Sequence, residues 1–361
     1  MPRATMVVDT TNHARNNFDC FRFVLAASVI LSHSPQLIDG NAHREILMQL
    51  TGNRLALGAT AVNAFFVISG YLITQSWLRS VTAGEYLLKR VLRIYPGYVA
   101  ASLFLLIVVV PLTSGERLWW RKDWIQPLYE IAVLRYNGGS NTFPTLPYHG
   151  GNGAVWTIPY EFWCYIVLAV VLGSLRHRIA VLTLFLTAYV GYEVKYLSGV
   201  PIDASLPLIN ELNDWPRFLT YYLSGACLFL YRGRIKYTGP YALVAAVFVI
   251  GCTAAGWSEI AMPVAGSYLL MYAAFLPVGR VNEFGKYGDF SYGVYLYGWP
   301  VQQLVLLWIP GIGPWPHFVA SLAGASLLAV TSWHLVERPF LRRKPGGRLR
   351  SRALADVKSS S

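Results

Sequence analysis

The sequence predicts an all-α polytopic membrane protein, a helix bundle with about ten transmembrane helices and both termini in the cytoplasm. Hydrophobic residues make up 55% of the 361 residues and charged residues only 13%, whereas soluble domains carry about 25% charged residues. Apolar stretches of about 20 residues, the length that spans a bilayer, recur along the whole chain. No long soluble domain fits between them.

Ten segments have the length and apolarity expected of spans. The third, seventh and eighth are apolar throughout, whereas polar residues interrupt the first, second and fourth. A polar leader without a convincing small-residue cleavage site precedes the first segment, so we expect a retained span rather than a signal peptide. The expected spans cover residues 17–36, 57–78, 92–112, 156–174, 179–197, 216–231, 238–255, 257–278, 290–309 and 316–336.

The net charge of +12 follows the expected topology. Most Lys and Arg residues fall on the side that we predict to be cytoplasmic, including the tail from Arg338 to Lys358. This asymmetry is the positive-inside pattern, and it argues against a nucleic-acid partner. We therefore expect a multi-pass protein of the inner (plasma) membrane, surrounded by the lipid bilayer, with an even number of spans.

One membrane domain is expected over residues 17–340, after a cytoplasmic leader (1–16) and before a basic, Ser-rich cytoplasmic tail (341–361). The four Cys residues all fall on expected spans, so the sequence predicts neither a disulfide framework nor a metal site. The longest connection, residues 111–155, is expected outside the cytoplasm and is rich in aromatic, Gly and Asn residues. Loops of this length are usually functional or disordered.

Arg22 and His33 lie eleven residues apart in the first span, so both side chains fall on one helix face, about 16 Å apart along the axis. Ionisable groups inside a membrane are costly and usually line a functional cavity. A neutral imidazole can take a proton from an attacking hydroxyl and return it later. The alternative for His33 is a polar residue at a helix end. Arg22 must find an anion, either Asp19 one turn earlier or a bound phosphate or carboxylate.

A basic cluster, formed by Lys89, Arg90 and Arg93, marks the cytoplasmic entrance of the third span. Lys89 and Arg93 are four residues apart and therefore neighbours on one helix face. Such a cluster can hold the phosphates of a nucleotide-like donor such as coenzyme A. Ordinary positive-inside flanking is the alternative.

Glu161 is a carboxylate in the fourth span, which makes it a functional candidate by default. It can orient His33 or bind an acceptor hydroxyl; the alternative is a structural pair with a basic group. With Arg22 and His33 it completes the expected catalytic set.

Four further residues are candidates for substrate binding: Asn63, Ser69, Trp156 and Tyr295. Asn63, Ser69 and Tyr295 are candidate hydrogen-bond donors to a tetrahedral oxyanion. Rings such as that of Trp156 can stack on a sugar; the alternative is an aromatic belt at the membrane interface. Ser69, with Gly70, also suits close helix packing. Glu337 is expected to be a structural anchor at the membrane edge.

In their order and spacing, these motifs resemble the acyltransferase-3 family of membrane proteins, which O-acylate carbohydrates and related acceptors. The resemblance extends from about Asn17 to Phe340. The matching motifs are Arg22-x10-His33, the Phe-Phe-x-x-Ser-Gly-x-Leu of Phe65 to Leu72, the Lys-Arg-x-x-Arg-Ile-x-Pro ending at Pro96, the Trp-Thr-x-x-x-Glu of Trp156 to Glu161, the Ser-Tyr-x-x-Tyr-Leu of Ser291 to Leu296, and the Glu-Arg-Pro-Phe that begins at Glu337.

The resemblance implies about ten spans and the transfer of an acyl group, commonly acetyl from acetyl-CoA, to an acceptor outside the cytoplasmic face. It implies that His33 is the essential general base, that Arg22 is its motif partner, and that Arg90 and Arg93 belong to the donor side. Gly298 departs from the family, since many relatives carry His there. Many relatives also carry a fused esterase-like domain, whereas the sequence here runs only about 20 residues beyond Glu337, so we expect the membrane domain or a separate partner to complete the transfer.

We therefore expect an O-acyltransferase that uses acetyl-CoA or another acyl-CoA as donor substrate and holds no permanently bound cofactor. The expected acceptor is a saccharide or lipid-linked saccharide, such as exopolysaccharide, O-antigen or lipo-oligosaccharide, and glycan assembly or export machinery is a possible partner. Two alternatives stay open on the sequence alone: a transporter whose polar stripe lines a permeation path, and a non-catalytic subunit of a polysaccharide export system.

Overall fold

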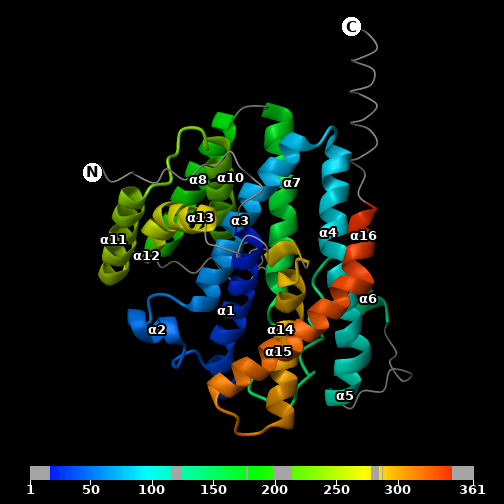
Figure 1. Cartoon of the computed structure of the whole chain (residues 1–361). Helices are drawn as coiled ribbons and strands as arrows, with labels where there is room; N and C mark the ends of the chain where they lie inside the picture. The colour runs from blue at the N-terminus through cyan, green and yellow to red at the C-terminus, as the bar shows by residue number, and fades with distance from the viewer. Residues whose placement is uncertain are drawn as a thin grey trace, which may run out of the picture.

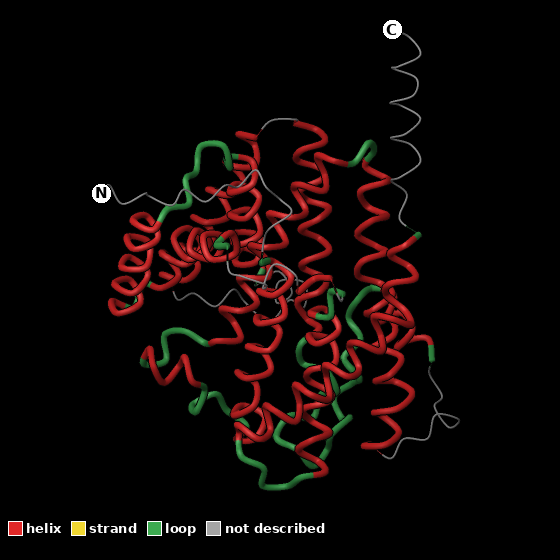
Figure 2. The backbone as a smooth tube through the Cα atoms, in the orientation of Figure 1, coloured by secondary structure: helices red, strands yellow, loops and turns green. Residues whose placement is uncertain are grey.

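The regular structure of the chain is helical throughout the residues that the structure describes (Figure 2), which confirms the all-α class. A computed structural model describes residues 17–114, 124–175, 178–198, 214–277, 284–286 and 288–343. The expected leader and most of the expected tail lie outside these ranges. The elements are α1 (Phe18–Asp39), α2 (Ile46–Thr51), α3 (Leu57–Arg79), α4 (Ala83–Phe104), η1 (Leu105–Val109), α5 (Val110–Ser114), α6 (Ile125–Ala132), η3 (Val155–Thr157), α7 (Ile158–Leu175), α8 (Arg178–Ser198), α10 (Trp215–Leu230), α11 (Gly239–Ala255), α12 (Ser258–Ala261), η4 (Met262–Gly266), α13 (Ser267–Phe275), α14 (Ser291–Trp308), α15 (Pro314–Ser332), η6 (Trp333–Glu337) and α16 (Arg338–Arg342).

Six helical stretches in the described residues are long and apolar enough to cross a membrane. The other four expected spans also form helices, namely α10, α11, the run from α12 to α13, and α14, but these are shorter or less apolar. The count of ten spans and the cytoplasmic position of both termini therefore stay predictions. The six stretches are Phe18–Asp39, Leu57–Arg79, Ala83–Ser114, Val155–Leu175, Arg178–Tyr196 and Pro314–Arg342.

Helices from both ends of the chain lie side by side (Figure 1): α1 packs against α3, α14 and α15. The closest crossing joins α3 to α10. A Cβ atom at Gly70 would collide with the backbone carbonyl of Tyr222, and one at Gly225 would collide with that of Val67. Small residues allow such close approach of membrane helices, so Gly70 has the packing role that the sequence allowed.

The last long helix crosses the bundle obliquely and ends beside α4 (Figure 1). It runs from α15 through the π-helical turn η6 into α16. π-helical turns are rare and frequent at functional sites. Glu337 is the last residue of η6 and only 2% exposed, so its side chain faces the interior of the bundle; its expected position at the membrane edge stays a prediction.

The last part of the long connection, around residues 148–152, is hydrogen-bonded to α14. The side-chain amide of Asn152 donates to the carbonyl of Leu296 at 2.9 Å, and that of Gln303 donates to the carbonyl of Tyr148 at 2.5 Å. These bonds fix the Gly- and Asn-rich stretch over one end of the bundle. Residues 115–123 lie outside the described part.

Candidate active site

A cavity of about 230 Å³ lies where α1, α3, α4, α7 and α14 meet. We call it the central cavity. Apolar residues of α3 line one wall, and Arg, Ser, Thr, Glu and Tyr side chains line the rest. Six of the residues predicted from the sequence lie on its surface: Arg22, Ser69, Arg90, Arg93, Glu161 and Tyr295.

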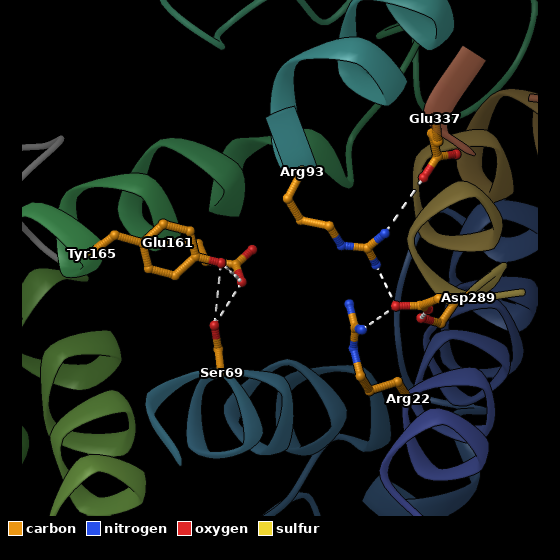
Figure 3. A network of polar contacts seen from close by, with 8 residues as sticks. Arg22, Ser69, Arg93, Glu161, Tyr165, Asp289 and Glu337 are labelled. Carbon is orange, nitrogen blue, oxygen red and sulfur yellow. Dashed lines mark hydrogen bonds and ion pairs between the residues drawn. The ribbon is translucent and has the colours of Figure 1, made fainter. Parts of the chain in front are cut away.

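One side of the central cavity is a network of four charged residues (Figure 3). Arg22 from α1 and Arg93 from α4 both donate to Oδ2 of Asp289, which lies just before α14. Arg93 also lies 3.7 Å from Oε2 of Glu337. Asp19, which was one of the two expected partners of Arg22, forms no ion pair with it in the described structure, so that prediction is wrong.

Neighbouring side chains hold this network in place. The hydroxyl of Ser291 donates to Oδ1 of Asp289 at 2.5 Å. The guanidinium of Arg93 lies over the ring of Tyr292, 5.5 Å from its centroid. The hydroxyl of Tyr292 in turn donates to the carbonyl of Ile94, at 3.0 Å. The Ser-Tyr motif of the ninth expected span therefore positions the carboxylate and one of its two guanidinium partners.

A carboxylate on the opposite side faces this network (Figure 3). Ser69 donates to Oε1 of Glu161 at 2.8 Å, and Tyr165 donates to the same oxygen at 2.5 Å. Glu161 forms no ion pair among the described residues, so the alternative of a structural pair with a basic group is wrong. Since a carboxylate offers about four acceptor sites on its two oxygens, Glu161 keeps the capacity to accept a hydrogen bond from a ligand hydroxyl.

Arg90 differs from the other two arginines of the cavity. It donates to the hydroxyl of Ser76 at 3.2 Å, its Nε atom is buried without a hydrogen-bond partner, and no carboxylate in the described ranges pairs with it. A guanidinium in that state favours an anionic ligand. Lys89, by contrast, does not line the cavity: it pairs with Glu85 at 2.5 Å and donates to Ser80 at 3.2 Å.

His33 lies outside the lining of the central cavity. Its ring is half-buried and meets the ring of Trp299 edge to face, with centroids 4.9 Å apart. The first turn of α3 lies close by, because a Cβ atom built at Gly58 would be 4.0 Å from Nε2 of His33. On α1 the imidazole is therefore about three turns, or about 16 Å, beyond Arg22.

Tyr295 lines the cavity, but its proton is already used. Its hydroxyl donates to the carbonyl of Ala154 at 2.7 Å, and the hydroxyl of Thr157 lies 2.7 Å from the same oxygen. Because a phenol has one proton, Thr157 is the donor in the second bond. Tyr295 has no proton left for an oxyanion in this arrangement.

The remaining two predicted residues, Asn63 and Trp156, do not line the central cavity. Asn63 accepts a hydrogen bond from Nε of Arg217 at 2.9 Å. Trp156 is 46% exposed and packs against the rings of Tyr160 and Phe218. The structure therefore brings together most of the expected set but leaves His33, Lys89, Asn63 and Trp156 outside.

A family model described as an acyltransferase domain matches residues 15–334, nearly the whole chain. The chain belongs to this acyltransferase family, the acyltransferase-3 family. The arrangement of basic groups, hydroxyls and a carboxylate around one cavity is thus the interior of a membrane acyltransferase.

Three relatives resemble this acyltransferase over most of their length. The O-acetyl transferase of Shigella phage Sf6 is 28% identical over 337 residues, which cover 92% of this chain and 97% of the relative. Nodulation protein 10 of Rhizobium leguminosarum bv. viciae is 27% identical over 358 residues, 91% of this chain and 94% of the relative. The exopolysaccharide production protein ExoZ of Rhizobium meliloti (strain 1021) is 27% identical over 316 residues, 81% of this chain and 92% of the relative. No solved structure matches the chain.

Gly298, where we expect many relatives to carry His, lies at a close helix contact. A Cβ atom at Gly298 would lie 3.0 Å from Cγ1 and 3.2 Å from Cδ1 of Ile30 on α1. Contacts that short require the side chain of Ile30 to shift by a few tenths of an ångström before any side chain fits at this position. A glycine at position 298 is therefore consistent with the close packing of α1 against α14.

Three residues of the acyltransferase site were not predicted: Asp289, Glu337 and Tyr165. Asp289 and Glu337 stand in or beside recognisable motifs, but their partners lie in other motifs, and Asp289 is 267 residues from Arg22. One sequence does not show which motifs meet. Tyr165 did leave a signal, because it follows Glu161 by four residues and therefore shares its helix face.

Proposed function

We propose that this acyltransferase moves an acetyl group from acetyl-CoA to a hydroxyl of a cell-surface or exported saccharide at the inner (plasma) membrane. Membership of the acyltransferase family supports acyl transfer as the type of reaction. The name of the phage relative supports acetyl as the group, and the name of the ExoZ relative supports an exopolysaccharide-like acceptor. The central cavity carries the proposal most directly, because it combines unneutralised basic charge with a hydroxyl-bonded carboxylate.

The donor is proposed to bind with its phosphates on the basic side. Arg90 is the strongest candidate for binding a phosphate, since no described carboxylate neutralises it and its Nε is buried without a hydrogen-bond partner. Arg22 and Arg93 are matched in number by Asp289 and Glu337, so they offer hydrogen-bond donors rather than net positive charge. Lys89, which lies outside the cavity with Glu85, would act at most as a distant attraction for the donor.

The proposed reaction is direct attack of the acceptor hydroxyl on the thioester carbonyl. The hydroxyl oxygen forms the new ester bond, the carbon–sulfur bond breaks, and the proton passes through His33 to the leaving thiolate. Glu161 is proposed to accept a hydrogen bond from a hydroxyl or amide N–H of a bound substrate in the central cavity, because its partner Ser69 is eleven residues, or about 16 Å, from the turn of α3 that faces His33. Because Ser69 and Tyr295 donate to Glu161 and Ala154, either must release that bond before it can stabilise an oxyanion.

The separation of His33 from the central cavity sets a condition on this mechanism. The acyl group must lie near the imidazole while the phosphates lie near the arginines, and these two positions are about 16 Å apart along α1. The extended pantetheine arm of acetyl-CoA is suited to such a span, with its phosphates held at one end and its thioester at the other. Donor and acceptor would then meet near His33 from opposite ends of the bundle.

The test is the O-acetyl content of surface glycans, measured by NMR in a deletion strain. The strain is rescued with wild type or with His33→Ala at matched protein levels. We expect acetyl signals to return only with wild type, and the shifted sugar resonances would identify the acceptor. Equal restoration by both forms would remove His33 from the chemistry.

A further inference from the structure

A second cavity, of about 670 Å³, lies along another face of α3. We call it the flanking cavity. It is bounded by the first turns of α3 and α10, the last turns of α8, and α12, and it shares no lining residue with the central cavity. Its volume falls within the range of about 300–1,000 Å³ that is usual for ligand-binding pockets.

The wall of the flanking cavity contains oriented polar groups. Arg217 donates from Nε to Oδ1 of Asn63 at 2.9 Å and from a terminal nitrogen to the carbonyl of Ala59 at 3.3 Å. These bonds fix a guanidinium and an amide side by side. Asn63 is only 7% exposed. The hydroxyl of Tyr221, near Asn63, is buried and has no hydrogen bond of normal geometry among the described residues.

Tyrosine rings and charges of both signs complete the wall. Tyr192 donates its hydroxyl to Glu259, and Tyr196 is 47% exposed. Arg54, Lys195 and Arg217 are opposed by Asp214 and Glu259. Arg54 already donates to the carbonyls of Thr253 and Ala254, and a polyphosphate such as the donor would meet two carboxylates. Amide, carboxylate and guanidinium groups beside tyrosine rings suit a ligand with hydroxyl edges and apolar ring faces, which is the chemistry of a saccharide.

The flanking cavity also lies close to the imidazole. Gly58 faces His33, and the next two residues, Ala59 and Thr60, line the cavity. His33 and the flanking cavity are therefore on two sides of a single turn of α3. A saccharide chain seated in the cavity would place its neighbouring units at the same end of the bundle as His33.

We infer that the flanking cavity is a subsite for the acceptor, which holds the sugar units adjacent to the unit that is acylated. This inference rests on the proposed function and adds to it a binding position outside the central cavity. It makes a specific claim about chain length. The subsite raises kcat/KM for acylation of an oligosaccharide and has no effect on kcat/KM for acylation of a single sugar.

The test compares two variants of the cavity wall on acceptors of two lengths. Tyr196→Ala removes an exposed ring, and Tyr221→Phe removes only a buried hydroxyl. The acceptors are single sugars and oligosaccharides prepared by size fractionation of the partially hydrolysed surface polysaccharide of the host strain. The enzyme is the full chain in lipid nanodiscs. The matched control is Tyr241→Ala on α11, which is 58% exposed and lines neither cavity.

We expect kcat/KM for the oligosaccharide to fall about tenfold in each variant, the change that about 1.4 kcal/mol of lost binding produces. The value for single sugars, the KM for acetyl-CoA and all values for Tyr241→Ala should stay at the wild-type level. Saturation-transfer difference NMR with the same oligosaccharide should lose signal in parallel.

Equal losses on both acceptor lengths would show a structural effect and overturn the inference, as would unchanged kinetics on both. Failure of the wild type to acylate any fragment, with acetyl-CoA binding intact, would instead contradict the proposed saccharide acceptor itself.

Discussion

Glu161 accepts the hydroxyl protons of Ser69 and Tyr165 on a single oxygen inside the central cavity. Two hydroxyls from two helices hold the carboxylate in one orientation without neutralising it. A charged, oriented carboxylate that faces a cavity is suited to bind or activate a hydroxyl. At the scale of single residues, this arrangement and the unpaired Arg90 are the features that make the cavity chemically competent.

Glu161→Gln tests the carboxylate. The amide keeps the size of the side chain but removes the negative charge, so Ser69 and Tyr165 keep an acceptor while the cavity loses its anion. We expect acetyl transfer to fall by about 100-fold, the lower end of what a positioned acid–base group contributes. The measurement is transfer from labelled acetyl-CoA by the purified protein. Activity within a few-fold of wild type would assign Glu161 a packing role.

Arg90→Gln tests the donor side. The variant loses the one cavity arginine that no described carboxylate pairs with, and a charge-assisted hydrogen bond is worth about 1.5–3 kcal/mol. We expect the Kd for acetyl-CoA, measured by calorimetry, to rise at least about tenfold. The matched control is Lys89→Gln, one residue earlier and outside the cavity. Equal weakening by both variants would indicate a general surface attraction rather than a built site.

At the scale of helices, the α3–α10 crossing fixes the face of α3 that carries Ser69 into the central cavity. Gly70 and Gly225 each meet the opposing backbone with no room for a methyl group. The ion network acts in the same way on other elements, since Asp289 joins the first turns of α1 to the middle of α4. The cavity is therefore shaped by contacts between helices that are distant in sequence.

Gly70→Ala tests the crossing. The added methyl group forces the backbones of α3 and α10 apart, and overpacking of this kind costs about 1–3 kcal/mol. We expect a lower thermal unfolding midpoint in detergent together with reduced activity. Gly251→Ala on α11 is the control, because a Cβ atom there meets no heavy atom within 4 Å. An unchanged midpoint for Gly70→Ala would show that the two helices can separate without cost.

At the scale of the whole molecule, the described residues form one helical bundle that contains the central and flanking cavities, with a folded connection over one end. The positive-inside pattern predicts that the connection lies outside the cytoplasm and that the basic ends of the helices lie on the cytoplasmic face. The orientation decides from which side donor and acceptor enter.

Cysteine labelling tests the orientation. In a cysteine-free background, Asn141→Cys in the connection should react with a membrane-impermeant maleimide in intact cells. Lys236→Cys, between α10 and α11, should react only after the cells are opened. Both positions are exposed in the structure, so accessibility reflects the side of the membrane. Reaction of Lys236→Cys in intact cells would reverse the predicted topology.

The sequence predicted the helical class, the membrane character and most of the central cavity, because each of these depends on local composition or on a motif within one helix. Arg22, Ser69 and Glu161 were found in this way. The pairing of Arg22 with Asp289 could not be predicted, since it depends on which helices pack together in the fold. The expectation that Asn63 lies in the same site as Ser69 ignored their separation of six residues, which turns the two side chains to different faces of α3.

The salt bridge between Arg22 and Asp289 has a consequence for the biosynthesis of the protein. The two residues are 267 positions apart, so at about 5–20 residues per second the ribosome needs roughly 15–50 s to make the second after the first. Until then α1 carries a guanidinium without this counter-charge, which would cost about 2.5–3.5 kcal/mol at the middle of a bilayer and less near the end of a span, where Arg22 lies. The pairing that joins α1 to the segment before α14 can therefore form only after most of the other helices have been made.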